Sequence, residues 1–397
     1  MNAIKIIACF CTIVFLTGCK EFENEPLVPA GGVPSTISDV AVENLPGTAK
    51  ITYSLPGNAD LLYVLAVYQT KNGIERSVKS SLYNNFVLLE GFPEAKPYQV
   101  KMYTVSKSEV RSEAVDVTVN PTIPRITEVW KTISMEADFG GVSISYDNEA
   151  KEAFVFNLLV KGANGIWELY DRHYSKMAAE SYSVRGLEPK EMEFGMSVLD
   201  RFGNNSDTLE FKLTPIYEEL IDKKIWKLLP LASDSSVPFY PYSNIEKIWD
   251  DNVHQQFGTT NYFYGHPVST KPLPNWFTID LGKQYKISRL KVNQYEGTGQ
   301  YMYTDGNPRV YEIWGSNTPS DNWDNWVLLR ACTSIKPSEL PIGVRTAEDI
   351  AYALAGEDFG FPIDKPSVRY IRFKLIETWS KQPNMLLDEI TFWGQKN

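Results

Sequence analysis

The chain has 397 residues, more than one hydrophobic core usually organises, so two or three domains are expected. Its formal net charge of -10 argues against nucleic acid and against a bare anionic membrane as partners, because such partners bind to a basic patch and the chain offers none. Apolar residues make up 43% of the chain, which is enough for packed cores, and no second long apolar stretch follows the one that ends at Leu16.

The N-terminal segment, residues 1–19, is typical of an export signal. Its apolar run from Ile4 to Leu16 carries Lys5 near the start and is too short to span a bilayer as a mature helix. The run closes with Leu16-Thr-Gly-Cys19, and small residues directly before a cysteine resemble a bacterial lipoprotein signal. That resemblance implies that cleavage leaves Cys19 as the lipid-bearing first residue. A plain secretory peptide or a buried N-terminal helix is the alternative.

Residues 20–34 are predicted to form a flexible linker. The sequence Lys20-Glu-Phe-Glu-Asn-Glu25 is followed by several prolines and glycines, a composition that cannot build a core. Acidic residues just after a lipidated cysteine also resemble the surface-export signal of Bacteroidetes lipoproteins. This resemblance implies a lipid anchor in the outer membrane, with the protein exposed on the cell surface.

Residues 35–122 and 123–220 carry nearly the same pattern twice. Two strands separated by a turn are expected early in each copy, and each copy ends in an alternating strand before a proline, Pro121 or Pro215. Short strands at regular spacing, with turn signals between them, indicate antiparallel sandwiches. The layout resembles fibronectin type III domains, which implies two immunoglobulin-like or fibronectin-like sandwiches in an all-β chain.

These two domains are predicted to be spacers. Neither holds a concentrated set of catalytic residue types, and their charged residues alternate with strand hydrophobics as solvated faces do. His173 has no second histidine or cysteine nearby, so a surface or edge-strand position is expected for it instead of metal ligation.

Residues 225–397 are predicted to form a third β domain, rich in aromatic residues. In the segment 368–375 the apolar Ile371, Phe373 and Leu375 alternate with charged residues, so one face of this strand is buried. Further strands are expected at 276–282, 287–292, 309–315, 326–330 and 386–394.

Four of these segments look like the coagulation-factor-type C domain, or discoidin fold. They are Trp276-x-x-x-Asp-Leu-Gly282, Tyr311-Glu-Ile-Trp-Gly-Ser316, Val368-Arg-Tyr-Ile-Arg372 and Leu387-x-Glu-Ile-x-Phe-Trp-Gly394. The resemblance implies an eight-stranded jelly-roll sandwich of the kind shared by many bacterial carbohydrate-binding modules. The whole arrangement is similar to Bacteroidetes lipoproteins encoded with polysaccharide-utilisation systems.

A helix is predicted inside the segment 336–366, which compact members of the discoidin family do not need. Thr346 is its expected N-cap, Asp349 follows three residues later, and Gly356 is the expected stop. We expect this insertion to cover an edge or to reshape the binding end of the domain.

The discoidin resemblance places ligands at the loops of one end of the sandwich. Sugar rings stack their apolar faces on aromatic planes while their hydroxyls bond to polar side chains, so a glycan site needs exposed aromatics beside polar groups. Ordinary packing of these aromatics against long loops is the alternative. The candidate ligand-binding residues are Tyr262, Phe263, Tyr264 and His266 in one loop, Tyr301, Tyr303 and Arg309 in a second, and Trp379 in a third.

Other aromatic residues are assigned to the interior. Trp276, Trp314 and Trp393 fall within strand patterns and are predicted to be core residues. Trp326 begins a strand and is expected to be buried. For Trp323 two predictions remain, burial in the core or a position that covers the edge of the sheet. Cys332, the one thiol outside the signal and the lipidation site, is predicted to be a buried strand residue.

A structural calcium ion is a further implication of the resemblance, since many discoidin-like modules hold one between an Asp-rich loop and a glutamate of the closing strand. Asp250, Asn252 and Glu389 occupy similar positions, and oxygen ligands suit calcium. Alternatively, Asp250 and Asn252 are turn formers. Both interpretations stay open, and no other cofactor is expected.

The predicted function is binding. The chain has no nucleophile elbow, no His-Glu-x-x-His, no phosphate loop and no Cys-His cluster, so enzymatic activity is not expected. We expect a surface lipoprotein that captures polysaccharide or oligosaccharide, held to outer-membrane lipid through Cys19 and serving an outer-membrane glycan uptake complex. One alternative is an adhesive or structural lipoprotein that binds another protein. The other is a glycoside hydrolase accessory enzyme with an unrecognised carboxylate pair.

Overall fold

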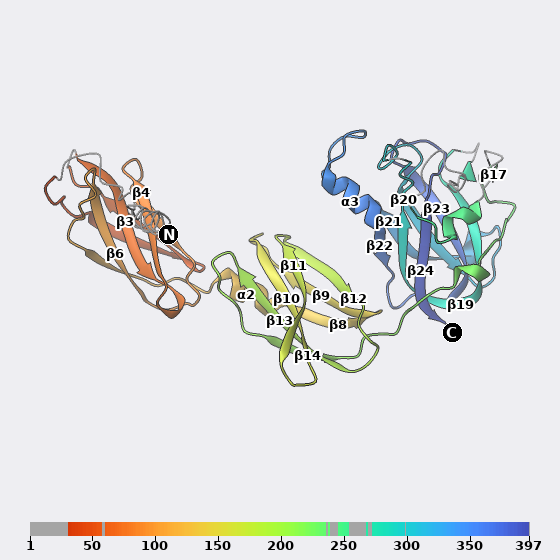
Figure 1. Ribbon diagram of the computed structural model, residues 1–397, viewed down its shortest axis with the longest axis horizontal. Helices are drawn as coiled ribbons and strands as arrows, with labels where there is room; N and C mark the ends of the chain where they lie inside the picture. The colour runs from red at the N-terminus through yellow and green to blue at the C-terminus, as the bar shows by residue number, and fades with distance from the viewer. Residues whose placement is uncertain are drawn as a thin grey trace, which may run out of the picture. The chain divides into compact units, whose positions relative to one another are not determined.

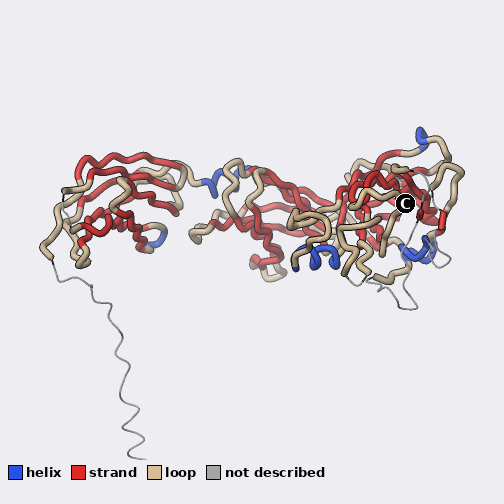
Figure 2. Tube along the Cα trace, turned by 90° about the horizontal axis from the view of Figure 1, so that it is seen from above, coloured by secondary structure: helices blue, strands red, loops and turns tan. Residues whose placement is uncertain are grey.

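The computed structural model describes residues 31–57, 60–235, 237–238, 245–253, 267–268, 272–297 and 299–396. Strands, red in Figure 2, make up most of its regular structure, and the helices are short. The prediction of an all-β protein is confirmed. Among the residues just named, no helix is both long enough and apolar enough to cross a membrane. The chain forms two compact units, the first made of Met1–Ile133, Tyr146–Glu180 and Gly195–Glu210, the second of Ser134–Ser145, Ser181–Phe194 and Phe211–Asn397.

The first unit begins with a β sandwich. Its elements are β1 (Ser38–Leu45), β2 (Thr48–Ser54), β3 (Leu61–Gln69), η1 (Lys71–Gly73), β4 (Glu75–Ser81), β5 (Phe86–Glu90), β6 (Tyr98–Ser106) and β7 (Val115–Val119). They form two antiparallel sheets in the orders β1-β2-β5 and β4-β3-β6-β7. Because side chains alternate along a strand, one side of each strand turns inward, and Ile51, Val64, Val87 and Val100 meet in one core. The sandwich expected from the strand pattern is present here.

The first unit continues with a helix and a second sheet. Helix α2 (Arg125–Thr132) follows Pro124 and buries Ile126 and Val129. This helix was not predicted from the sequence, although a proline before the first turn and an acidic residue within that turn are ordinary signals of a helix start. The sheet has the order β11-β10-β13-β14. Its strands are β10 (Phe154–Lys161), β11 (Trp167–Ser175), β13 (Met192–Asp200) and β14 (Leu209–Leu213).

The second unit contains a small sheet and the terminal sheet. In the small sheet the order is β12-β9-β8, from β8 (Ser134–Asp138), β9 (Gly141–Asp147) and β12 (Ala179–Arg185). The terminal sheet comprises β15 (Glu219–Leu220), β16 (Lys227–Leu228), β19 (Asn275–Asn293), β20 (Pro308–Ser316), β21 (Val327–Thr333), β22 (Glu357–Gly360), β23 (Val368–Thr378) and β24 (Glu389–Lys396). Its order is β15-β24-β19-β23-β20-β21, with β16 and β22 also paired to β19. Short elements complete the unit: η2 (Lys223–Ile225), β17 (Val237–Pro238), η3 (Ile245–Trp249), β18 (Pro267–Val268) and η4 (Trp323–Asn325).

The long strand β19 bends in its middle, and its two halves pair with different strands. Its residues 275–280 pair with β23, and its residues 285–293 pair with β24. Gly282 lies at the bend with a φ of 79°, in the left-handed region that favours glycine. The sequence predicts two strands separated by a turn here, and the structure joins them through this bend. Buried side chains from both halves enclose a single apolar core that includes Phe373 and Phe392.

The helix predicted within 336–366 is confirmed as α3 (Ala347–Ala355), labelled in Figure 1. The Thr346 hydroxyl accepts a hydrogen bond from the Asp349 backbone N–H, and the Asp349 carboxylate accepts one from the Thr346 backbone N–H. This is a capping box, which satisfies N–H groups that a helix start leaves without partners. Gly356 ends the helix with a φ of 76°.

Asp349→Asn is expected to release the insertion around α3 while the terminal sheet stays folded. Burial alone raises the pKa of Asp349, but hydrogen bonds from Thr346, Ser338 and Lys336 outweigh it and hold the pKa well below its usual range. A lowered pKa means that the ionised carboxylate stabilises the insertion above pH ~4, and that this contribution is lost as the pH falls further. Hydrogen exchange at pH 7 should show faster exchange of the α3 amides in the variant.

The exposed neighbour Glu348 provides the matched control, since Glu348→Gln removes a charge on the same turn without touching this network. Equal protection of α3 in the Asp349 variant and in the control would contradict the assigned role.

Candidate functional site

Several of the predicted site residues lie outside the described residues. Tyr262, Phe263, Tyr264 and His266, and the lipidation residue Cys19, belong to this group and stay predictions.

Two of the predicted ligand aromatics are in the interior, so their assignment as exposed stacking residues is wrong. Tyr303 is fully buried, and its hydroxyl donates a 3.0 Å hydrogen bond to the backbone oxygen of Asp349. Trp379 is 8% exposed and lies edge-on to Tyr303, with 5.2 Å between the ring centroids. Met302 and Ala353 of α3 complete the cluster. The inserted helix covers the rings that a shorter loop would leave in water.

The other two predicted residues of this region are less enclosed. Tyr301 is half-buried, with its ring centroid 5.4 Å from that of Tyr295. The Arg309 guanidinium lies 5.2 Å from the centroid of Trp379 and pairs with Glu377 at 2.9 Å. Neither arrangement tests ligand binding, and both residues stay predictions.

The residues present at the predicted calcium position do not fit a calcium ion. The Lys223 ammonium is hydrogen-bonded to the Glu389 carboxylate, and its Nζ lies 2.8 Å from an oxygen of Asp251. A protein cation therefore already neutralises the buried glutamate. Asp250 accepts a hydrogen bond from the backbone N–H of Asn252 at 3.1 Å, as a turn former does. Across the described ranges, no group of three or more His, Cys, Asp or Glu residues is placed to hold a metal ion.

Two structural predictions for single residues are confirmed. Cys332 is buried on β21, and burial raises the pKa of its thiol to about 12, which keeps it protonated and unreactive. His173 lies on β11, an edge strand, and its Nε2 is 3.0 Å from Glu180.

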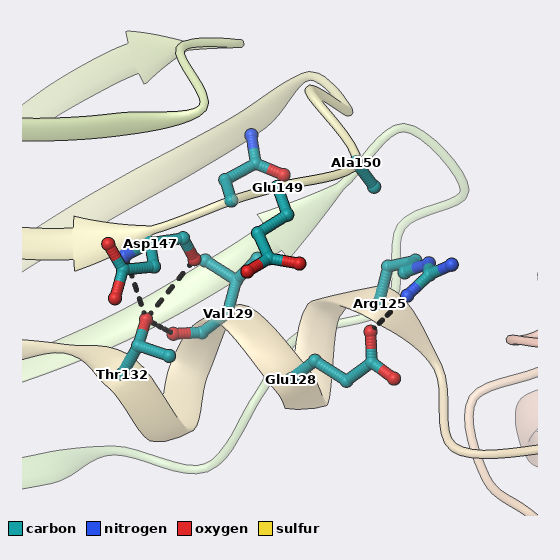
Figure 3. Close-up of a pocket in the computed structure, with 8 residues that line it drawn as sticks. Arg125, Glu128, Val129, Thr132, Asp147, Glu149 and Ala150 are labelled. Carbon is teal, nitrogen blue, oxygen red and sulfur yellow. Dashed lines mark hydrogen bonds and ion pairs between the residues drawn. The ribbon is translucent and has the colours of Figure 1, made fainter.

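A cavity of about 350 Å³ lies between α2 and the turn that follows β9 (Figure 3). Arg125 pairs with Glu128 at its mouth, with 2.6 Å between the charged atoms. The Thr132 hydroxyl donates to the backbone oxygen of Val129 at 2.7 Å. Carboxylates and helix side chains line this cavity, and no aromatic ring is among them. A sugar would find no stacking plane here.

Three half-buried tryptophans meet on the outer face of the terminal sheet. Trp276 on β19 and Trp314 on β20 flank β23, and Trp323 on η4 lies edge-on to both, 5.1 Å from each ring centroid. Lys374 of β23 lies opposite Trp276 where β23 pairs with β19, and opposite Glu312 where β23 pairs with β20. We call these five residues the tryptophan face.

The tryptophan face carries a fixed pair of opposite charges. Lys374 Nζ lies 2.8 Å from the Glu312 carboxylate, which also accepts a 2.9 Å hydrogen bond from the Trp314 indole N–H. Burial alone raises the pKa of Glu312, but the hydrogen bonds from Lys374 and Trp314 outweigh it and hold the pKa below its usual range. The two groups form an ion pair beside the indole rings.

A buried arginine on the same outward side of β23 contacts these rings. The Arg372 side chain is fully buried, and its guanidinium carbon lies 4.6 Å from the centroid of Trp323 and 4.2 Å from that of Trp326. It lies 3.5 Å from Asp234 and also donates to the backbone oxygen of Ser320. Cation–π contact and ion pairing therefore hold the indoles in one arrangement.

The tryptophan face was not predicted from the sequence, because Trp276, Trp314 and Trp393 were expected to be core residues. That assignment is wrong: all three are half-buried residues on the outward side of their strands. Alternation along the strand gives the signal, since Phe277 fills the core beside Trp276, and Ile313 does so beside Trp314. Trp326 is buried, as expected.

The chain matches three families, each described as a domain of unknown function. The matches are DUF4959 at residues 34–121, DUF5126 at residues 122–224 and DUF5000 at residues 249–394. None of the curated proteins matches the chain.

Among solved structures, the chain is similar to a SusE-like protein at 29% identity, over 69% of this chain and 100% of the other, with a TM-score of 0.45. It is also similar to the C-terminal domain of a chitobiase from Bacteroides fragilis, at 15% identity over 45% and 99% of the two chains, with a TM-score of 0.32. A two-domain fibronectin type III segment of chicken tenascin matches at 12% identity over 45% and 99%, with a TM-score of 0.23. With TM-scores below 0.5, these likenesses assign no function to the chain.

Proposed function

We propose that this chain is a glycan-binding protein that captures polysaccharide on the tryptophan face. The observation that carries the proposal is the set of three half-buried indoles held beside the Lys374–Glu312 ion pair on the outward side of the sheet. Indole planes take the apolar face of a sugar ring, and a neighbouring cation and carboxylate take its hydroxyls.

The cellular setting belongs to the same proposal and comes from the sequence alone. A lipid on Cys19 would hold the chain at the outer membrane, and in the sequence the linker and the two predicted spacer domains separate Cys19 from the terminal domain. Capture there would supply an outer-membrane glycan uptake complex, and no chemical step on the glycan is required of this chain.

Affinity gel electrophoresis of the purified full chain against a panel of polysaccharides tests the proposal. Trp323→Ala and Trp314→Ala are each expected to weaken binding by about tenfold or more, because a truncated aromatic anchor costs ~1.4 kcal/mol or more. Trp393→Ala is the matched control. Trp393 is also half-buried on the outer side of its strand, but the Arg289 guanidinium covers it, 3.7 Å from the ring centroid.

Two results would overturn the assignment. Unchanged binding in the Trp314 and Trp323 variants, together with loss in Tyr262→Ala and Tyr264→Ala, would move the site to the predicted loop and remove the tryptophan face from it. Absence of binding to every polysaccharide would remove the function itself.

A protein partner is the second candidate, favoured by apolar side chains on the insertion around α3. Large apolar residues are exposed there within a short stretch: Ile335, Leu340, Ile342, Val344, Ile350, Tyr352 and Leu354. Exposed apolar patches of this kind mark contact surfaces on many proteins. If no polysaccharide is retarded, a pull-down that Ile342→Ser abolishes would support this candidate.

A further inference from the structure

A second cavity, also of about 350 Å³, lies on the sheet β11-β10-β13-β14 of the first unit. Three neighbouring strands contribute to it, and its volume is within the range of small-ligand sites. It shares no residue with the tryptophan face or with the predicted loops. Its lining includes Phe154, Val155, Tyr174, Lys176, Asp200 and Arg201.

An exposed aromatic ring forms one wall of this cavity. Tyr174 is 69% exposed and stands opposite Val155 in the register of β10 and β11. Phe154 and Phe156 are buried, so alternation places Val155 and Tyr174 on the outward side of the sheet. The cavity floor is therefore apolar, and the phenol ring beside it offers a stacking plane to a ligand.

The polar groups around the cavity favour an anion. Lys176 is exposed and forms no ion pair within the described part of the chain. Arg201 adds a second positive charge, partly shared with Glu90 at 2.6 Å. Asp200 is turned into its own loop, where its carboxylate accepts hydrogen bonds from the backbone N–H groups of Phe202 and Asn204. Lys176 is thus the charged group of the lining that remains to pair with an anionic ligand.

We propose that this cavity binds a uronic acid residue of an acidic glycan. The apolar face of the sugar ring lies on Tyr174, and the sugar carboxylate pairs with Lys176. The inference goes beyond the proposed function, because it gives the first unit a binding site of its own and assigns it a charged class of ligand.

Isothermal titration of the full chain with tetragalacturonate tests this site, and the fully methyl-esterified tetrasaccharide serves as the uncharged probe of the same shape. The free acid should bind at least several-fold more tightly than the ester. Tyr174→Ala should weaken binding of the acid by about tenfold. Lys176→Gln should weaken it by about two- to fivefold and remove the preference for the acid over the ester, as expected for a solvent-exposed pair.

Tyr83→Ala is the matched control, since Tyr83 is a 99% exposed tyrosine of the first sandwich and lies away from the cavity lining. Thermal melts of all variants check that they are folded, which these exposed substitutions should not affect. Equal affinity for acid and ester, wild-type affinity in both cavity variants, or no binding of tetragalacturonate would overturn the inference. Trp323→Ala should leave this binding unchanged, so failure of the tryptophan face and failure of this cavity are told apart.

Discussion

Lys223→Ala is expected to lower the free energy of unfolding of the second unit by about 3 to 5 kcal/mol, the usual cost of removing one partner of a buried ion pair. Glu389 is 1% exposed, and the Lys223 side chain is 5% exposed. Without the ammonium, the carboxylate would keep, among the residues that the structure describes, only the hydrogen bond from the Asp251 backbone N–H, at 3.2 Å. A buried charge with so little compensation is among the most costly features a folded protein can carry.

The loss should depend on pH in a defined direction. Burial raises the pKa of Glu389 to about 7, against the opposing effect of Lys223. A carboxyl whose pKa is higher in the folded state stabilises the fold at low pH, and that contribution is lost as the pH rises through the folded-state value. The variant lacks the ammonium that lowers this pKa, so its unfolding free energy should fall further below wild type at pH 8 than at pH 6.

Urea unfolding followed by tryptophan fluorescence measures both effects, because every tryptophan except Trp130 and Trp167 lies in the second unit. Lys224→Ala is the matched control, since Lys224 is an exposed neighbour on the same turn. A Lys223 variant as stable as this control would contradict the assigned role. Calcium that stabilises the wild-type protein would contradict the view that an ammonium takes the cation position at Glu389.

The fold was predictable where local chemistry repeats. Period-two alternation predicts the strands of the first sandwich and the inward positions of β23, and the Thr346–Asp349 spacing predicts α3. Two features were not accessible in this way. Helix α2 is one short amphipathic stretch within a long series of strands. The joining of two predicted strands into β19 depends on the bend at Gly282, on either side of which β19 pairs with a different strand, β23 or β24.

The site was less predictable, because exposure of a loop aromatic depends on what packs over it. Tyr303 and Trp379 have the composition of a ligand loop, yet α3 from a distant segment buries them. Trp276 and Trp314 have the composition of a core strand, yet their neighbours Phe277 and Ile313 take the inward positions. Alternation counted from the inward residues Phe277 and Ile313 predicts the outward positions of Trp276 and Trp314. No such count predicts the burial of Tyr303 and Trp379, because it depends on a segment that is distant in the sequence.

Arg372→Met is expected to be the most damaging single change at the tryptophan face. Methionine keeps much of the apolar volume but removes the cation that neutralises Asp234, whose side chain is 2% exposed. Burial raises the pKa of Asp234 and lowers that of Arg372, and the opposite charge of each partner acts against the shift of the other. Breaking such a pair from one side should cost about 3 to 5 kcal/mol of unfolding free energy. Polysaccharide binding should also fall further than in Trp323→Ala, because Trp323 and Trp326 both lose the guanidinium they lie against.

A double variant separates these two effects. Arg372→Met combined with Asp234→Asn should recover most of the stability, because replacing both partners of a buried pair costs far less than replacing one. It should not recover polysaccharide binding, since the indoles still lack their support. Urea unfolding and affinity gels on the same preparations measure the two properties. If the double variant regains binding along with stability, the guanidinium only neutralises Asp234 and does not order the tryptophan face. If Arg372→Met alone binds polysaccharide like the wild-type chain under conditions where it is folded, the arginine has no part in the site.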